Sequence, residues 1–206
     1  MNLLIIVILP ILSALAVLPF KQRQQVRFIA LAGSLVQWVA ALALFYFYSA
    51  GESKDAVMFF EQNYQWYQPL NINFHVGVDG ISIAMILLTA TVVLAGILVS
   101  WKEERMSKEF FFLLLLLSAG AYGFFVSLDL FTMFFFLELA VIPKFLLIGI
   151  WGSGKKEYSA MKLALMLMAG SALVFVGLAG LYFNTSTDGN YTFDILQIAS
   201  LNISPA

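Results

Sequence analysis

The chain has 206 residues, of which 62% are hydrophobic and 11% are charged, so it carries too little polar surface to cover a soluble globule of this size. The formal net charge of −1 excludes the broad basic surface of a nucleic-acid-binding protein. With no cysteine and one histidine, the chain lacks the ligands of a thiolate, iron–sulfur or multi-histidine metal site, so its chemistry has to come from carboxylates and lysines.

Six apolar stretches are long enough, or nearly so, to cross a bilayer, which requires about 20 residues. They are residues 3–20, 28–48, 81–101, 110–126, 130–151 and 163–183. We therefore expect an all-α integral membrane protein in which six transmembrane helices form one membrane domain over residues 1–206. The first stretch is interpreted as a retained helix and not as a signal peptide, because basic residues follow it instead of preceding it.

The basic residues between these helices predict the orientation, since Lys and Arg are enriched in cytoplasmic loops. The long loop 49–80 carries only Lys54, whereas eight basic residues lie in the loops after the first, third and fifth helices. The eight are Lys21, Arg23, Arg27, Lys102, Arg105, Lys108, Lys155 and Lys156. Loop 49–80 is therefore expected outside, together with both ends of the chain.

The outer loop 49–80 contains a run of aromatic residues, namely Phe59, Phe60, Tyr64, Trp66 and Tyr67. Tyrosine and tryptophan gather at the level of the lipid headgroups, so a membrane-interface belt is the simpler interpretation. A stacking surface for a ligand is the alternative.

Two acidic residues lie just before the apolar runs of the third and fifth helices, Asp79 and Asp129. A carboxylate in this position accepts hydrogen bonds from the free N–H groups of the first helical turn and favours the helix dipole. We expect each of them to cap its helix.

Glu138 lies near the middle of stretch 130–151 and therefore near the bilayer midplane. A charge there costs about 2.5–3.5 kcal/mol, so such a residue normally faces the protein interior, pairs with a cation or is protonated. A glutamate whose lysine partner moves can exchange a proton, which makes Glu138 a proton-relay candidate; a glutamate held permanently by a neighbouring helix is the alternative. Pro143 cannot donate to the carbonyl of Leu139 and predicts a kink beside the carboxylate.

Two lysines are further relay candidates. Lys144 lies six residues after Glu138, about 120° around the helix, so the two cannot form an i,i+4 pair. Its stem can extend toward the cytoplasmic edge marked by Trp151, which leaves a snorkelling anchor and an inward-facing relay group both open. Lys162, near the start of the sixth helix, reaches the interface more easily, and the same two readings apply to it.

Three ordered motifs span most of the chain. GVDGIS at 77–82 opens the third helix; LDL, FFFLE and VIP follow one another within 128–151; and KEYSAMK at 156–162 precedes Gly170 and Ser171. In order and separation they resemble the antiporter-like subunits of respiratory complex I, in particular subunit M of bacterial NADH–quinone oxidoreductase, whose patterns are G-[IV]-D-G-[IL]-S, LDL…FFWE…L-[IV]-P and Y-x-A-x-K-F…GS.

The resemblance implies the N-terminal part of a fold of about fourteen helices with two inverted five-helix repeats. It also implies a subunit of a proton translocase in which electron transfer from NADH to quinone drives proton pumping. NADH, FMN, iron–sulfur clusters and quinone are then expected in partner subunits, with no cofactor, metal or redox chemistry in this chain. The expected partners are other membrane subunits of complex I and the lipids of the bacterial plasma membrane.

The resemblance also assigns roles to single residues. Glu138 matches the family's fifth-helix glutamate, which pairs with a lysine on a later helix, and Lys162 matches a sixth-helix lysine at the edge of the same polar chain. Lys144 departs from the pattern, which more often has an apolar residue after the proline. Three alternatives remain at this point. One is a subunit of a multi-subunit Na⁺/H⁺ antiporter, which shares the helix pattern and the glutamate; the others are a different antiporter-like subunit of complex I and a membrane fragment without transport.

Overall fold

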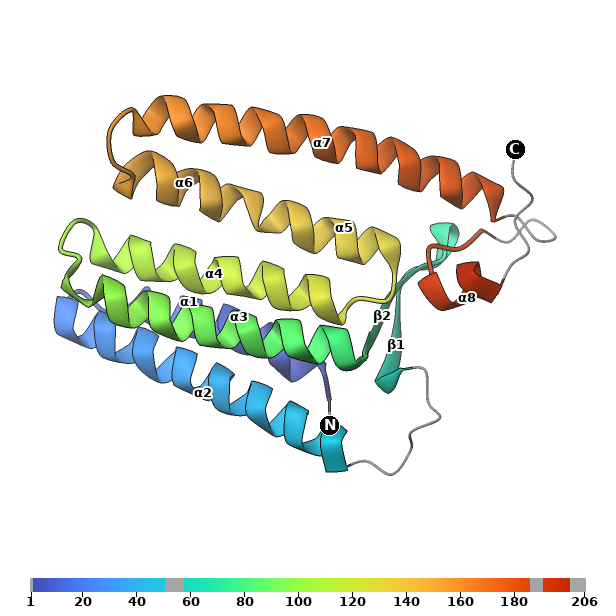
Figure 1. The fold of residues 1–206 in the computed structure, drawn as a ribbon, viewed down its shortest axis with the longest axis horizontal. Coiled ribbons are helices and arrows are strands. Elements are labelled where there is room, and N and C mark those ends of the chain that lie inside the picture. Colours follow the sequence, from blue (N-terminus) through green and yellow to red (C-terminus); the bar gives the residue numbers. More distant parts are fainter. Residues whose placement is uncertain (1, 51–57, 186–190, 201–206) are drawn as a thin grey trace.

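The computed structural model describes residues 2–50, 58–185 and 191–200, and Figure 1 shows long helices lying side by side with a hairpin and a short helix at one end. The helices are α1 (Leu4–Val17), α2 (Arg23–Ala50), α3 (Gly80–Val99), α4 (Ser107–Val126), α5 (Leu130–Leu139), α6 (Val141–Trp151), α7 (Lys156–Asn184) and α8 (Ile195–Ser200). The strands β1 (Phe59–Tyr67) and β2 (Ile72–Val78) and the 3-10 turns η1 (Gln68–Leu70) and η2 (Ser100–Lys102) complete the described elements.

The predicted helical membrane domain is confirmed, with one difference in the number of spans. Five runs are long and apolar enough to cross a bilayer: α2, α3 with η2, α4, the Leu130–Trp151 run and α7. The first helix, α1, has 14 residues, fewer than the about 20 that a straight crossing requires. The sixth span therefore stays a prediction.

Helix α4 lies at the centre of the bundle and packs against α1, α2, α3, α5 and α6. Glycine allows α5 to come close, because a Cβ at Gly120 would lie 2.9 Å from the Cβ of Ala140 and 3.0 Å from the carbonyl oxygen of Phe136. Helix α7 instead packs mainly along α6, and its buried residues are Ala160 and Tyr182, near its two ends. Between them α7 presents an apolar face that the described residues leave exposed.

The loop 49–80 adds an element to the helical fold that the sequence did not predict: β1 and β2 form a two-stranded antiparallel sheet. Residues 72–78 alternate apolar and polar side chains from Ile72 to Val76, which is the period of a strand. The turn uses Asn71 in the left-handed conformation, with φ of 49°, a conformation that Asn tolerates. The pairing is irregular on the β1 side, with register shifts between Phe59 and Gln62 and between Gln65 and Tyr67, so β1 carries no clear alternation.

The outer layer consists of the hairpin together with residues 127–129 and 191–200. Backbone hydrogen bonds join its parts: Leu128 N–H donates to the carbonyl of His75 over 2.8 Å, and Ile195 N–H donates to the carbonyl of Leu128 over 2.9 Å. The segments before α5 and before α8 also pair at Asp129 and Asp194. Three stretches that are far apart in the sequence therefore form one structure at this end of the bundle.

The opposite end of the bundle collects the basic loops (Figure 1). Trp151 Nε1 donates to the carbonyl of Arg105 over 2.7 Å, and Arg23 lies 3.5 Å from the carboxylate of Glu104. Lys108 Nζ donates to the carbonyl of Leu18 over 3.4 Å. The basic residues that predict the cytoplasmic side are thus at one end and the hairpin at the other.

Candidate functional site

The helix that carries Glu138 is interrupted beside it. Helix α5 ends at Leu139 and α6 begins at Val141, and Ala140 between them keeps helical dihedral angles while its N–H is shared between the carbonyls of Phe136 and Glu138. Pro143 lies one turn after Leu139 and has no N–H to donate to that carbonyl. The helix is interrupted at the position of the predicted kink, and the interruption leaves polar backbone at membrane depth next to the carboxylate.

Glu138 lies on the side of α5 that faces α7. Phe134, one turn earlier, has its ring centroid 5.5 Å from that of Phe175 on α7. Helices α5 and α7 run antiparallel, so a step forward along α5 corresponds to a step backward along α7. Glu138, four residues after Phe134, therefore lies level with Ser171, four residues before Phe175. Within the described part of the chain, Glu138 Oε1 is buried and has no hydrogen-bond partner.

The two lysines predicted as relay residues, Lys144 and Lys162, do not contact Glu138. Lys162 lies nine residues along α7 from Ser171, about 13 Å by helical rise, and its side chain is exposed. Lys144 is also exposed and lines a groove of about 420 Å³, whose other lining residues come mainly from α3, α4 and α5 and are apolar except for Thr89 and Ser118. Neither ammonium has an ion-pair partner among the described residues, so the relay assignments of Glu138, Lys144 and Lys162 stay predictions.

Other polar side chains inside the bundle were not singled out by the sequence. Gln37 on α2 is buried, and its Oε1 lies 3.4 Å from the hydroxyl of Ser118 on α4. Gln37 Nε2 and the Tyr122 hydroxyl, which follows Ser118 by one turn, are buried without a partner among the described residues. The signal for Gln37 was present in the sequence, as a lone amide within the apolar stretch 28–48.

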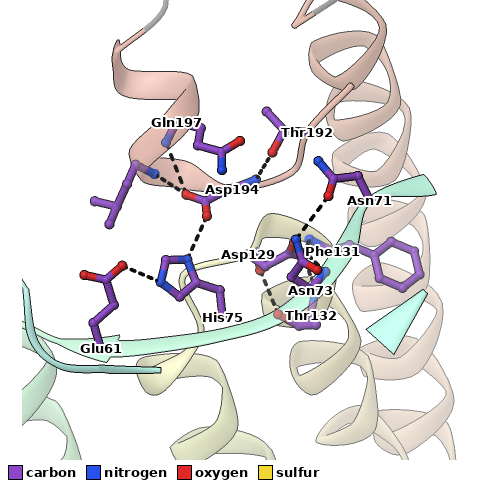
Figure 2. Close-up of polar contacts among 11 residues, drawn as sticks. Glu61, Asn71, Asn73, His75, Asp129, Phe131, Thr132, Thr192, Asp194 and Gln197 are labelled. Atoms are coloured by element: carbon purple, nitrogen blue, oxygen red, sulfur yellow. Dashed lines mark hydrogen bonds and ion pairs between the residues drawn. The ribbon is translucent and has the colours of Figure 1, made fainter. Parts of the chain in front are cut away.

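The densest polar cluster lies in the outer layer (Figure 2). His75 on β2 is 3% exposed; its Nδ1 lies 2.7 Å from Asp194 Oδ2 and its Nε2 lies 2.8 Å from Glu61 Oε1. Asp194 also accepts from the N–H groups of Leu196 and Gln197 at the start of α8. Sequence reasoning missed this cluster because its members come from three separate stretches of the chain.

Asp129 and Asp79 cap their helices as predicted. Asp79 accepts from Ser82 N–H over 2.7 Å, and Asp129 accepts from Phe131 and Thr132 N–H over 2.9 and 3.1 Å. Asp129 is fully buried, and this burial raises its pKa above the ordinary value of 3.8, with a further rise from the charge of Asp194. The N–H groups that it caps, and that of Asn73, oppose the shift.

Within the described segments, no group of three or more His, Cys, Asp or Glu side chains is arranged to hold a metal ion. The cluster around His75 is instead held by hydrogen bonds and charge.

Curated relatives match almost the whole chain. It is 34% identical over 200 residues to NAD(P)H-quinone oxidoreductase chain 4-1 of Synechocystis sp., an alignment that covers 96% of this chain and 37% of the relative. It is 37% identical over 180 residues to the chloroplastic chain 4 of Chlorokybus atmophyticus, covering 86% of this chain and 34% of the relative. The chain spans about a third of the length of the curated relatives that it matches.

Solved structures share the fold. A chain of respiratory complex I from Thermus thermophilus with bound NADH superposes with a TM-score of 0.80 at 21% identity, covering 95% of this chain and 38% of that one. A chain of the membrane-bound sulfane sulfur reductase, an archaeal respiratory membrane complex, gives 0.78 at 23% identity, covering 97% and 40%. Residues 127–203, which include Glu138, match the family model described as NADH:quinone oxidoreductase/Mrp antiporter, TM.

Proposed function

Since the chain belongs to the antiporter-like membrane subunits of NAD(P)H-quinone oxidoreductase, we propose that it is part of a subunit that moves protons across the membrane as electrons pass from NAD(P)H to quinone. The electron transfer takes place in partner subunits, which hold the nicotinamide, FMN, iron–sulfur clusters and quinone. This chain contributes membrane helices and a proton-exchanging carboxylate. Its partners are the neighbouring membrane subunits of that complex, in the bacterial plasma membrane.

One observation carries the proposal: Glu138 has a buried carboxylate oxygen without a partner among the described residues, beside a break in its helix. A carboxylate in an apolar span is costly unless a cation or a proton compensates it. No described cation reaches it, so it is free to respond to a charge brought by another helix or to take up a proton. Because burial and a nearby ammonium act in opposite directions on its proton affinity, a moving lysine would load and unload it.

The purified full-length protein tests this proposal. It should co-purify with NAD(P)H-oxidising subunits and with quinone reductase activity that acidifies one side of a vesicle. The family description that matches residues 127–203 also includes Mrp antiporters. Purification without an NAD(P)H-oxidising partner, together with rescue of salt tolerance in an antiporter-deficient cell, would favour that second function and contradict the first.

The proposed orientation places the outer layer outside and the basic loops in the cytoplasm. The chain has no cysteine, so a single introduced one gives labelling without background. A cysteine at Gln65 on the exposed surface of β1 should react with an impermeant maleimide from outside, and a cysteine at exposed Gln24 only after the membrane is opened. Reaction of both from the same side would overturn the orientation.

A further inference from the structure

His75 is placed between two carboxylates. Figure 2 shows its ring between Asp194, which precedes α8, and Glu61, which lies on β1. The two nitrogen-to-oxygen distances are 2.7 Å and 2.8 Å, both short enough for hydrogen bonds to a charged group. Asp194 is 3% exposed, whereas the side chain of Glu61 is 50% exposed.

The two contacts bear on how many protons the cluster of His75, Asp194 and Glu61 holds. A neutral imidazole carries one N–H, so it can donate to one carboxylate only, and its other nitrogen would turn a lone pair toward an ionised oxygen. An imidazolium donates to both. With two ionised carboxylates, the observed geometry therefore requires one proton more than a neutral histidine supplies.

The surrounding charges favour the same proton. The titratable groups of the elements packed around His75 are acidic: Glu61 on β1, Asp194 before α8, and Asp129 at the start of α5, beside Asp194. Asp79, at the start of α3, adds a fourth carboxylate. The described residues of the outer layer contain no Lys or Arg, so an imidazolium is the cation that they offer to these acids.

We propose that His75 is a proton-binding site of the outer layer, whose imidazolium form ties residues 191–200 to the hairpin through Asp194 and Glu61. Loss of the proton at alkaline pH replaces one attractive contact by a repulsive one, and the attachment of α8 weakens. Water reaches the group through half-exposed Glu61. The proposal is independent of proton pumping, since it concerns only how the outer layer is held.

Hydrogen exchange of the full-length protein with its native partners tests this. The protection factors of amides 195–200, corrected for intrinsic exchange, should fall about tenfold between pH 6 and pH 9, the size expected for loss of a hydrogen bond to a charged group. In His75→Gln, protection should be low and independent of pH. Gln65→Ala, an exposed position on β1, is the control and should behave as the parent does. Parent protection that does not change with pH would overturn the proposal.

Glu61→Gln gives a second test should His75→Gln fail to assemble. A glutamine amide can donate to a neutral imidazole nitrogen, so His75 keeps both contacts without the extra proton. Protection of amides 195–200 should then stay high at pH 9. If Glu61→Gln keeps the pH dependence of the parent, the proton is not held between these side chains.

Discussion

Three carboxylates at the hairpin end of the bundle, Asp79, Asp129 and Asp194, accept hydrogen bonds from backbone N–H groups, and a fourth, Glu61, contacts His75. The carboxylate inside the bundle has no such partner among the described residues. Glu138 has a buried oxygen without a partner, and the ammonium groups of Lys144 and Lys162 have no carboxylate to pair with in the described residues. Each carboxylate at the hairpin end of the bundle therefore has a partner within the described chain, and Glu138 does not.

This difference separates structural charges from candidates for transport. A charge that is fully hydrogen-bonded holds elements together, and its removal should lower stability. For a buried charge without a partner, no hydrogen bond or ion pair offsets the desolvation cost. Another helix, a proton or water therefore has to compensate the charge. Substitutions in the outer layer and in α4 are therefore expected to change stability, and substitution of Glu138 to change transport.

The largest effect is expected for Glu138→Gln in the full-length subunit within the assembled complex. Glutamine has nearly the same shape and still forms hydrogen bonds, but it cannot hold a negative charge or exchange a proton. NAD(P)H-driven acidification in vesicles should fall by about 100-fold or more, the effect typical of losing a proton-transferring group.

The control is Glu138→Asp, which retains the titrating group one methylene further back and should give an intermediate rate. The amount of assembled complex has to be equal in all samples. Pumping by Glu138→Gln at the parental rate would show that Glu138 is a structural residue.

Gly120→Ala should give the next largest effect, on stability. The added Cβ would meet the Ala140 Cβ at 2.9 Å and the Phe136 carbonyl at 3.0 Å, and backbone atoms of α5 cannot rotate away. Overpacking of this kind costs about 1–3 kcal/mol. Gly170→Ala on α7 is the matched control, because a Cβ added there would have no described atom within 4 Å apart from its own stretch of helix. Thermal unfolding of the solubilised protein should separate the two variants; equal melting temperatures would contradict the close α4–α5 contact.

Asp129→Ala should destabilise the start of α5 by about 1–2 kcal/mol, since it removes the acceptor for two N–H groups. Hydrogen exchange at Phe131 and Thr132 measures this. Asp129→Asn, which keeps one acceptor oxygen, should lose less.

The same pair of variants tests the pH dependence of stability. Burial raises the pKa of Asp129, so the folded state binds its proton more tightly than the unfolded state does. This contribution to stability is present below the ordinary value of 3.8 and is lost as pH rises through the folded-state pKa. Asp129→Asn cannot titrate, so its stability relative to the parent should improve as pH rises through that range. A difference that does not vary with pH would contradict the raised pKa.

The sequence predicted the helices, a disturbance of the helix beside Glu138 and the caps at Asp79 and Asp129, because each of these depends on residues a few positions apart. It did not predict the hairpin, since the register shifts of β1 hide the alternation that β2 shows. It also missed the cluster around His75, whose partners lie 14 and 119 residues away in the chain. Hydropathy and spacing identify a charge inside a membrane span, but only the packed fold shows which charges find a partner.

The smallest effect is expected for Lys144→Met. Lys144 is exposed and lies at the edge of an apolar groove between α3, α4 and α5, and its ammonium has no carboxylate partner in the described residues. A methionine side chain fills the same volume along the groove and removes a charge that is costly at this depth. Assembly should be unchanged, and pumping should fall by less than it does for Glu138→Gln. Because the two substitutions lie only six residues apart on one interrupted helix, a similar loss from both would assign Lys144 to the relay; the expected difference would mark it as an anchor that extends toward the cytoplasmic surface near Trp151.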